Sequence, residues 1–234
     1  MINVSISHFS SAMGYCQFTA VNRYHLRLKP RLMPHTLAGR ALHERLEAED
    51  KLIPREEATK EQLADPFFDL DFTREGVTVS FDRINGNHFR YLGRTDKVIR
   101  HQGVIYIIDD KVTSKPASGL YHDRLLQLAA YCEAFIRSYS RMIAFNKVVF
   151  NVVHRRPDGG VIQENKVDYT PEVNAILVRD LNTFEGIINK TTQPDHHNNP
   201  KKCAPCGFFD QCKWRIESPP LPPGVAVMNN SNSS

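Results

Sequence analysis

The sequence predicts one α/β domain with a mixed β-sheet, and three observations lead to that fold class. Apolar residues at helical spacing alternate along the chain with short runs of strand-forming residues. The strand-like runs come in pairs separated by turn residues, as in antiparallel hairpins. A chain of 234 residues that is 41% hydrophobic can bury one core and does not require two.

Four segments have the apolar spacing of helices. They cover residues 7–28, 36–50, 120–138 and 171–189. Pro30 and Pro34 separate the first two segments, and Pro171 suits the first turn of the last one. The charged stretch 44–65 is expected to extend the second helix and then to run into a surface loop.

Six runs have the composition of strands. They cover residues 77–81, 88–92, 97–100, 104–111, 147–154 and 161–169. Turn residues at 85–87, 101–103 and 157–160 separate them in pairs. Because a long helix stands between the fourth and fifth runs, the order predicts a mixed central sheet flanked by helices.

The net charge and the composition of the two terminal segments indicate which partners and cellular locations to expect. The formal net charge of +4 suits a polyanionic partner without establishing one. No apolar run approaches the roughly 20 residues that cross a bilayer, and the first 16 residues lack the features of a signal peptide. We therefore expect no membrane association and an intracellular protein, cytoplasmic or inside a host cell if viral, and not secreted. Residues 218–234 are expected to form a disordered tail, which leaves 1–217 as the domain.

The most informative pattern places acidic residues at the end of an apolar strand. In a strand, Asp109 and Lys111 share one face, whereas Asp110 points to the other. If the chain turns back at Gly103, Asp96 can lie beside Asp109. Two carboxylates and a lysine would then meet at one edge of the sheet.

Such a constellation suits a hard divalent cation. Mg²⁺ and Mn²⁺ prefer oxygen ligands, and the bound ion polarises a phosphate and lowers the pKa of its water. A nearby lysine can orient that water or stabilise the charge that develops on the phosphate. For an isolated D-x-K, a surface salt bridge is the simpler interpretation. The apolar run before Asp109 weakens it, because the charges stand where a buried strand emerges.

Two further patterns fit the same site. His43 stands early in a predicted helix, where imidazole can serve as an additional metal ligand, although a partly exposed helix histidine is the commoner case. Gln127 and Tyr131 lie four residues apart and therefore on one helical face. They can contact a nucleic-acid backbone or position the lysine, or they can be ordinary helix residues.

The series G-x-x-x-H, G-x-x-D, D-x-K and Q-x-x-x-Y, in this order over residues 39–131, resembles the RecB-like branch of the PD-(D/E)XK nucleases. The resemblance implies a restriction-endonuclease-like core and Mg²⁺- or Mn²⁺-dependent hydrolysis of DNA. It also implies a metal site made of His43, Asp96, Asp109 and the main-chain carbonyl of Asp110, with Lys111 as the catalytic lysine. Val112 departs from the family, which often has threonine directly after the lysine.

Five cysteines in a reducing compartment indicate metal ligands or core residues more than disulfides. Cys203, Cys206 and Cys212 form C-x₂-C-x₅-C, and three thiolates so close can hold zinc or an iron–sulfur cluster. Either centre commonly takes four ligands, and Cys16 and Cys132 are the candidates for the fourth. Cys132 lies in an apolar helix and is expected to be a core thiol. The spacing alone leaves zinc open.

One early cysteine followed by a late triplet resembles the iron–sulfur subset of the same nucleases, which includes the AddB helicase–nuclease subunit and the cluster-bearing nuclease of CRISPR adaptation. The resemblance implies a [4Fe–4S] cluster on Cys16, Cys203, Cys206 and Cys212. Its expected role is a staple between the N-terminal and C-terminal regions of the domain, because metal-binding energy becomes folding energy.

The expected function is a single-stranded DNA exonuclease, with possible endonuclease activity, in recombination and repair, CRISPR adaptation or viral DNA processing. The sequence has no phosphate-binding G-x-x-x-x-G-K-[ST], so no built-in helicase motor is expected. The DNA would be opened by a partner such as a helicase, or the nuclease would act beside recombination or CRISPR adaptation proteins. Arg23, Arg27, Lys29 and Arg31 either follow the DNA backbone or form a solvated helix face. Two alternatives are an inactive DNA-binding or scaffold protein on the same fold and a zinc-stapled interaction protein.

Overall fold

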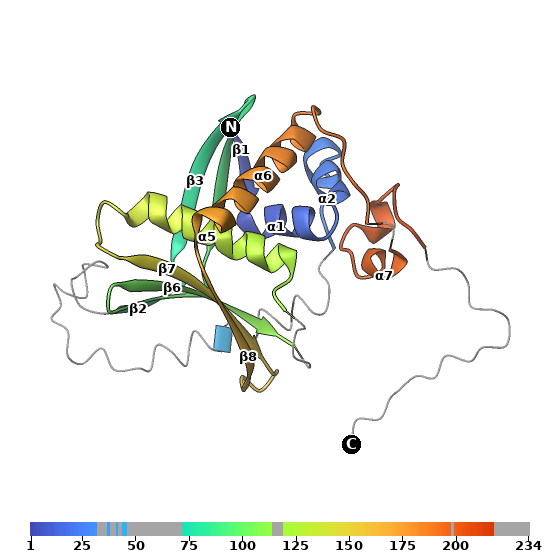
Figure 1. Cartoon of the computed structure of the whole chain (residues 1–234). Helices are drawn as coiled ribbons and strands as arrows, with labels where there is room; N and C mark the ends of the chain where they lie inside the picture. Colours follow the sequence, from blue (N-terminus) through green and yellow to red (C-terminus); the bar gives the residue numbers. More distant parts are fainter. Residues whose placement is uncertain are drawn as a thin grey trace, which may run out of the picture.

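The computed structural model describes residues 1–31, 72–113, 119–197 and 199–217, together with Leu37, Ala41, Glu44 and Arg45. Among these residues, a pair of β-sheets encloses a layer of helices (Figure 1). The predicted tail, 218–234, lies outside the described residues. So does most of the predicted helix over 36–50, of which the four single residues named above are helical.

The larger sheet has five strands in the order β2-β5-β6-β7-β8. Their bounds are Phe72–Glu75 for β2, Lys97–His101 for β5, Val104–Val112 for β6, Lys147–Arg155 for β7 and Val161–Asp168 for β8. Strands β6 and β7 run parallel, and the other neighbours are antiparallel. The predicted fold class, a mixed sheet flanked by helices, is therefore confirmed.

The smaller sheet has the order β1-β4-β3, with β1 at Ile2–Ser5, β3 at Thr78–Asn85 and β4 at Asn87–Arg94. Gly86 has a φ of +69°, which a glycine adopts without strain in the tight turn between β3 and β4. The sequence did not predict β1, which pairs in parallel with β4 more than 80 residues further along the chain.

The predicted continuous helix over 7–28 is wrong, because the segment divides into three. Helix α1 covers Ile6–Gly14, α2 covers Phe18–Ala20, and a π-helical turn covers Val21–His25. The end of α1 lies against the start of the next long helix. A Cβ added at Gly14 would lie 2.4 Å from the backbone nitrogen of Asp123, so the glycine permits this close approach.

The two long helices agree closely with the predicted segments. Helix α5 covers His122–Tyr139 and α6 covers Pro171–Ile188, with Pro171 in the first turn and the Thr170 side chain as the N-cap. Helix α5 is the central element of the molecule. It contacts α1, α6 and β3 as well as β6 and β7, so it lies between the two sheets.

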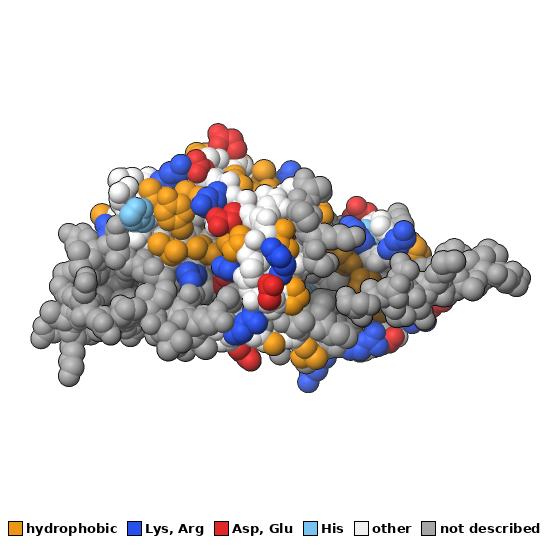
Figure 2. Space-filling view, turned by 90° about the horizontal axis from the view of Figure 1, so that it is seen from below, with side chains coloured by type: hydrophobic (Ala, Val, Ile, Leu, Met, Phe, Trp, Pro, Cys, Tyr) orange, Lys and Arg blue, Asp and Glu red, His pale blue; other side chains and the backbone are white. Residues whose placement is uncertain are grey.

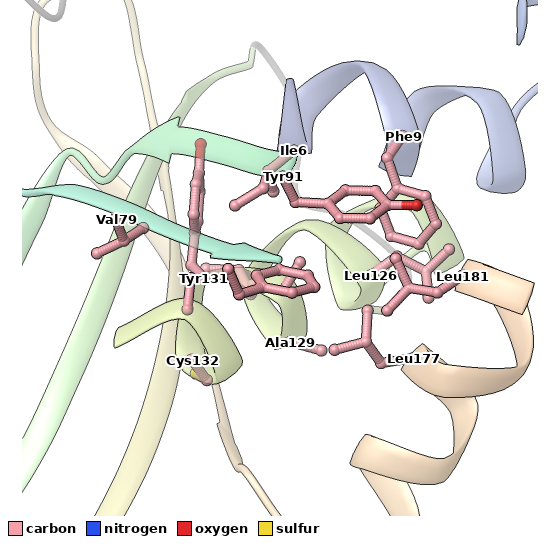
Figure 3. Packing of buried hydrophobic residues seen from close by; sticks show 14 of the residues in the cluster. Ile6, Phe9, Val79, Tyr91, Leu126, Ala129, Tyr131, Cys132, Leu177 and Leu181 are labelled. Carbon is pink, nitrogen blue, oxygen red and sulfur yellow. The ribbon is translucent and has the colours of Figure 1, made fainter. Parts of the chain in front are cut away.

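The core brings α1, α5, α6 and the smaller sheet together (Figure 3). The Phe9 ring packs edge-on against Tyr91 and Phe184, with ring centroids 5.7 and 5.4 Å apart. Burial of such aromatic side chains stabilises the fold by roughly 1.5–3 kcal/mol each. The core therefore fixes α5, the helix that also faces the larger sheet.

A buried carboxylate links α6 to the smaller sheet. Glu185 is fully buried, and it accepts hydrogen bonds from Arg83 at 2.7 Å, Asn85 at 3.0 Å and the Tyr91 hydroxyl at 3.1 Å. A buried charge is tolerated when it is paired and hydrogen-bonded in this way. This network therefore fixes the C-terminal half of α6 against the β3–β4 hairpin.

Candidate active site and cysteine corner

The β5–β6 hairpin brings the two predicted acids together. Lys97 pairs with Ile108 in the antiparallel register, so the preceding residue, Asp96, stands beside Asp109. The backbone N–H of Asp110 donates to Oδ2 of Asp96 at 2.8 Å. The turn that permits this contains Gly103 with a φ of +75°.

Strand alternation separates Asp109 from its neighbour in sequence. The ammonium of Lys111 lies 2.9 Å from Oδ1 and 2.8 Å from Oδ2 of the buried Asp109 carboxylate. The Asp110 carboxylate is on the other face of β6, where Arg155 Nε donates to it at 2.5 Å. One carboxylate thus belongs to the Lys111 side of the sheet, and the other forms a structural ion pair.

Helix α5 supplies two more of the predicted residues. The Gln127 amide donates to Oδ1 of Asp109 at 3.3 Å and lies 3.4 Å from the Tyr131 hydroxyl. A Cβ added at Gly93 would lie 2.5 Å from Cε1 of Tyr131. The glycine of G-x-x-D is therefore the residue that lets Tyr131 pass close to β4, and two motifs far apart in sequence meet physically.

The acids of this site repel one another. Burial, followed by the charge of the Asp109 carboxylate, raises the pKa of Asp96 to about 7, although Lys111 acts in the opposite direction. A divalent cation between the two carboxylates would relieve both the repulsion and the cost of burial. The donor set, oxygen from two acids, fits Mg²⁺ or Mn²⁺.

His154 was missed by the sequence analysis. It pairs with Lys111 in the parallel β6–β7 register and therefore lies on the same face of the sheet. Its side chain is only 8% exposed, and burial followed by the charge of Arg124 lowers its pKa. The imidazole is thus neutral at pH 7 and able to accept a hydrogen bond. Its position beside Lys111 follows only from the pairing register of β6 and β7, which the sequence does not reveal.

The predicted metal ligand His43 lies outside the described residues, so its role stays a prediction. Arg45, two residues further on, donates to the carbonyl of Pro157 at 3.1 Å. This contact places Arg45 beside the β7–β8 turn. Asp96, Asp109, Lys111, Gln127 and Tyr131 are brought together by the structure.

Four cysteines from the two ends of the described chain line one cavity, which we call the cysteine corner. They are Cys16, Cys203, Cys206 and Cys212. The remaining cysteine, Cys132, is fully buried in the core on α5. Backbone contacts support the corner, since Arg31 N donates to Gly207 O at 2.8 Å and the Tyr15 hydroxyl donates to Lys202 O at 2.6 Å.

Two histidines that the sequence analysis did not single out also line the cysteine corner. The ligand atoms of Cys16, His196 and His197 all lie within 4.8 Å of one another. His197 Nδ1 accepts from the backbone N–H of Asn199 at 2.9 Å, so the neutral ring carries its proton on Nε2, 3.8 Å from the Cys203 sulfur. Thiols and imidazoles so close fit a soft or borderline metal centre.

Side chains of both charge signs lie among the described residues on the face seen from below. Figure 2 shows Lys and Arg side chains interspersed there with Asp and Glu. No helix among the described residues is long and apolar enough to cross a membrane.

Comparison with known proteins identifies the family. Residues 68–213, more than half of the chain, match the model of the PD-(D/E)XK nuclease superfamily, and the chain belongs to that superfamily. Nucleases of this superfamily typically use a divalent metal ion. No curated protein matches the chain in sequence.

Solved structures share the fold. The crystal structure of SSO0001 superposes with a TM-score of 0.57 at 16% identity, covering 92% of this chain and 88% of that one. A protein from Eubacterium rectale, provisionally assigned as an exonuclease, gives a TM-score of 0.50 at 12% identity and covers 93% and 90%. At these identities the likeness shows the fold alone.

Proposed function

We propose that this nuclease is a Mg²⁺- or Mn²⁺-dependent deoxyribonuclease of the RecB-like branch, acting on single-stranded DNA as an exonuclease with possible endonuclease activity. The observation that carries the proposal is the meeting of Asp96, Asp109 and Lys111 where β5 begins and β6 ends, next to Gln127. An inactive scaffold protein would have no need for buried acids that repel one another.

Each residue has a distinct role in the proposed site. Asp96, Asp109, the carbonyl of Asp110 and His43 would hold the metal, which when bound polarises the phosphate and lowers the pKa of its water. Lys111, held by Asp109, would stabilise charge on the phosphate. Gln127 and Tyr131 position Asp109 through the hydrogen bonds described above.

The test is cleavage of end-labelled oligonucleotides. Single-stranded and duplex DNA of one sequence, labelled at the 5′ or the 3′ end, are incubated with Mg²⁺, with Mn²⁺ and with EDTA. We expect metal-dependent shortening of the single strand, with the label revealing the direction. Cleavage that ignores chelation, or none with any divalent metal, would contradict the proposal.

We also propose that the cysteine corner holds a [4Fe–4S] cluster. The support is that Cys16 joins Cys203, Cys206 and Cys212 around one cavity although they come from opposite ends of the domain. His196 and His197 favour zinc as the second candidate. Anaerobically purified protein should contain iron and sulfide and absorb broadly in the visible, whereas stoichiometric zinc without sulfide would identify the zinc form.

The cellular setting belongs to the same proposal. A nuclease for single strands requires DNA that is already opened, so we propose that the protein acts inside the cell beside a helicase or beside recombination or CRISPR adaptation proteins. Viral DNA processing is an equivalent setting. Purification from the native host with its associated proteins would identify which of these partners it has.

A further inference from the structure

We propose that a second surface pocket, next to the cysteine corner, holds nucleotides of the single-stranded DNA substrate. The inference rests on the proposed function and deepens it, since it names where the strand is held away from the reacting phosphate. We call this feature the aromatic pocket. It has a volume of about 340 Å³ and is lined chiefly by Phe18, Val21, His25, Ile187, Lys190 and Trp214.

The pocket lies where the two ends of the domain meet. Figure 1 shows α2 beside the C-terminal end of α6, with α7 (Pro200–Cys203) next to them. A volume of this size is in the range of about 300–1,000 Å³ that small-molecule sites occupy. The pocket is therefore large enough for about one nucleotide.

The walls provide surfaces suited to a nucleobase. The rings of Phe18 and Trp214 lie 4.4 Å apart and are inclined by 38°. Both side chains are only half-buried, so some of each ring is available to a ligand. Stacking of bases on such aromatic surfaces is the usual means of binding single strands without sequence preference, because every base has a π-face.

Cations at the rim suit the phosphates. Lys190 lines the pocket and has a φ of +63°, which is the left-handed conformation. This conformation caps the C-terminal end of α6, because the backbone N–H of Lys190 donates to Ile187 O and that of Thr191 donates to Gly186 O. Glycine or asparagine usually occupies such a position, because a longer side chain strains the backbone there. The strained lysine places an exposed ammonium at the rim.

A second cation adjoins the tryptophan. The ammonium of Lys213 lies 4.4 Å from the centroid of the Trp214 ring. Among the described residues, no carboxylate forms an ion pair with Lys190 or Lys213, in contrast to Arg31, which is paired with Asp210. Both ammonium groups are thus available to an anionic ligand.

Another wall of the pocket has an unusual backbone. Val21 and His25 begin and end the π-helical turn, in which Leu26 N donates to Val21 O at 3.1 Å. Single π-turns occur frequently at functional sites. The exposed Arg23 lies in this turn and the exposed Arg27 follows it, so the segment that lines this wall carries positive charge.

The cysteine corner positions the aromatic walls. Phe18 lines both cavities, and it follows Cys16 by two residues, as Trp214 follows Cys212. A metal centre that fixes both cysteines would also fix both rings. The metal centre would then support binding of the DNA strand, and its removal would weaken DNA binding even where no cleavage is measured.

Binding without cleavage tests the inference. The protein is titrated into a fluorescently labelled oligothymidylate of about 15 nucleotides in low-salt buffer without Mg²⁺ or Mn²⁺, and the fluorescence anisotropy is recorded. We expect Lys190→Glu and Trp214→Leu to weaken binding by at least about five-fold. Arg141→Glu, an equal charge change at an exposed site beyond the far end of α5, should change it by less than about two-fold.

A second measurement locates the strand. Bromodeoxyuridine in the same oligonucleotide should crosslink to Phe18 or Trp214, as mapped by mass spectrometry. Because Lys190 is exposed, its variant should fold even if the Trp214 variant does not. Binding unchanged by Lys190→Glu, equal affinity for duplex, or crosslinks only elsewhere would overturn the inference. If the wild type binds the strand at this pocket but cleaves no DNA, the proposed nuclease function is wrong, and the pocket remains supported as a DNA-binding site.

Discussion

At the scale of single residues, the site depends on how Asp109 is held. Lys111 bridges both of its oxygens and Gln127 donates to one of them, so the carboxylate keeps one orientation in a buried position. Asp96 is held separately, by the backbone N–H of Asp110. The two acids thus remain close although their charges repel, which is the arrangement that a divalent cation stabilises.

Asp96 should make the stability of the metal-free protein depend on pH. Its pKa is about 7 in the folded protein and 3.8 ordinarily, so the folded state binds the proton more tightly. This contribution is fully present below about pH 4 and is lost as the pH rises through 7. Wild type should therefore lose on the order of 1–3 kcal/mol relative to Asp96→Asn between pH 5 and 8.

Urea unfolding of both proteins in EDTA at a series of pH values measures this difference. Saturating Mg²⁺ should abolish the pH dependence of stability in the wild type, because the bound cation takes the place of the proton on Asp96. A difference between the two proteins that stays constant from pH 5 to 8 would show that Asp96 does not titrate in this range.

The sequence predicted the acids and the lysine because their relation is local. Alternation within one strand orients Asp109, Asp110 and Lys111, and a single turn brings Asp96 beside them. His154 depends on the pairing of two strands about 40 residues apart, and no local pattern encodes that register. The histidines of the cysteine corner lie in a loop without periodicity, and for this reason they were missed as well.

At the scale of elements, α5 connects the core to the site. One face of the helix packs with α1, α6 and the smaller sheet. Gln127 reaches Asp109 of the larger sheet, and the Tyr131 ring passes beside β4 with its hydroxyl next to Gln127. Both long helices could be predicted because 18 residues contain several apolar turns. The four-residue β1 could not, because it forms only by pairing with the distant β4.

Gly93→Ala should disturb the site through this helix. The added methyl would lie 2.5 Å from the Tyr131 ring, which packs on β4 and cannot move freely, so α5 must shift. We expect a destabilisation of about 1–3 kcal/mol. Activity should also fall in protein that remains folded, because Gln127 would lose its position over Asp109.

The matched control is Gly119→Ala, since no atom of the described part of the chain lies within 4 Å of a Cβ at that position. Thermal unfolding and cleavage rates of the two variants make the comparison. Equal behaviour of the two alanine variants would mean that the contact between Gly93 and Tyr131 has no role in the site.

At the scale of the whole molecule, the two ends of the described chain meet at the cysteine corner. Cys16 comes from the start of the domain and the triplet from its end, and Phe18 packs on Trp214 beside them. A metal centre here would close a loop of nearly 200 residues, which adds stability by restricting the unfolded chain. The motif predicted three of the four cysteines from local spacing, and the fourth followed only from family resemblance.

Two cysteine variants separate the corner from the core. Cys16→Ala should lose the visible absorbance and the iron, and its unfolding temperature should fall by several degrees. Cys132→Ala should keep the full iron content and lose only about 1–2 kcal/mol, since it removes a buried sulfur from the core. Retained iron in Cys16→Ala together with loss in Cys132→Ala would reverse the assignment.

The most direct test of the active-site proposal compares the two adjacent acids. Asp109→Asn should abolish metal-dependent cleavage in a folded protein, because it removes a ligand charge. Asp110→Asn keeps the main-chain carbonyl, and its amide oxygen can still accept from Arg155, so substantial activity should remain with a loss of stability of about 1–3 kcal/mol. Both are assayed at saturating Mg²⁺ or Mn²⁺, with circular dichroism to verify folding. The account predicts an inactive Asp109→Asn and an active Asp110→Asn, and the reverse result would contradict it.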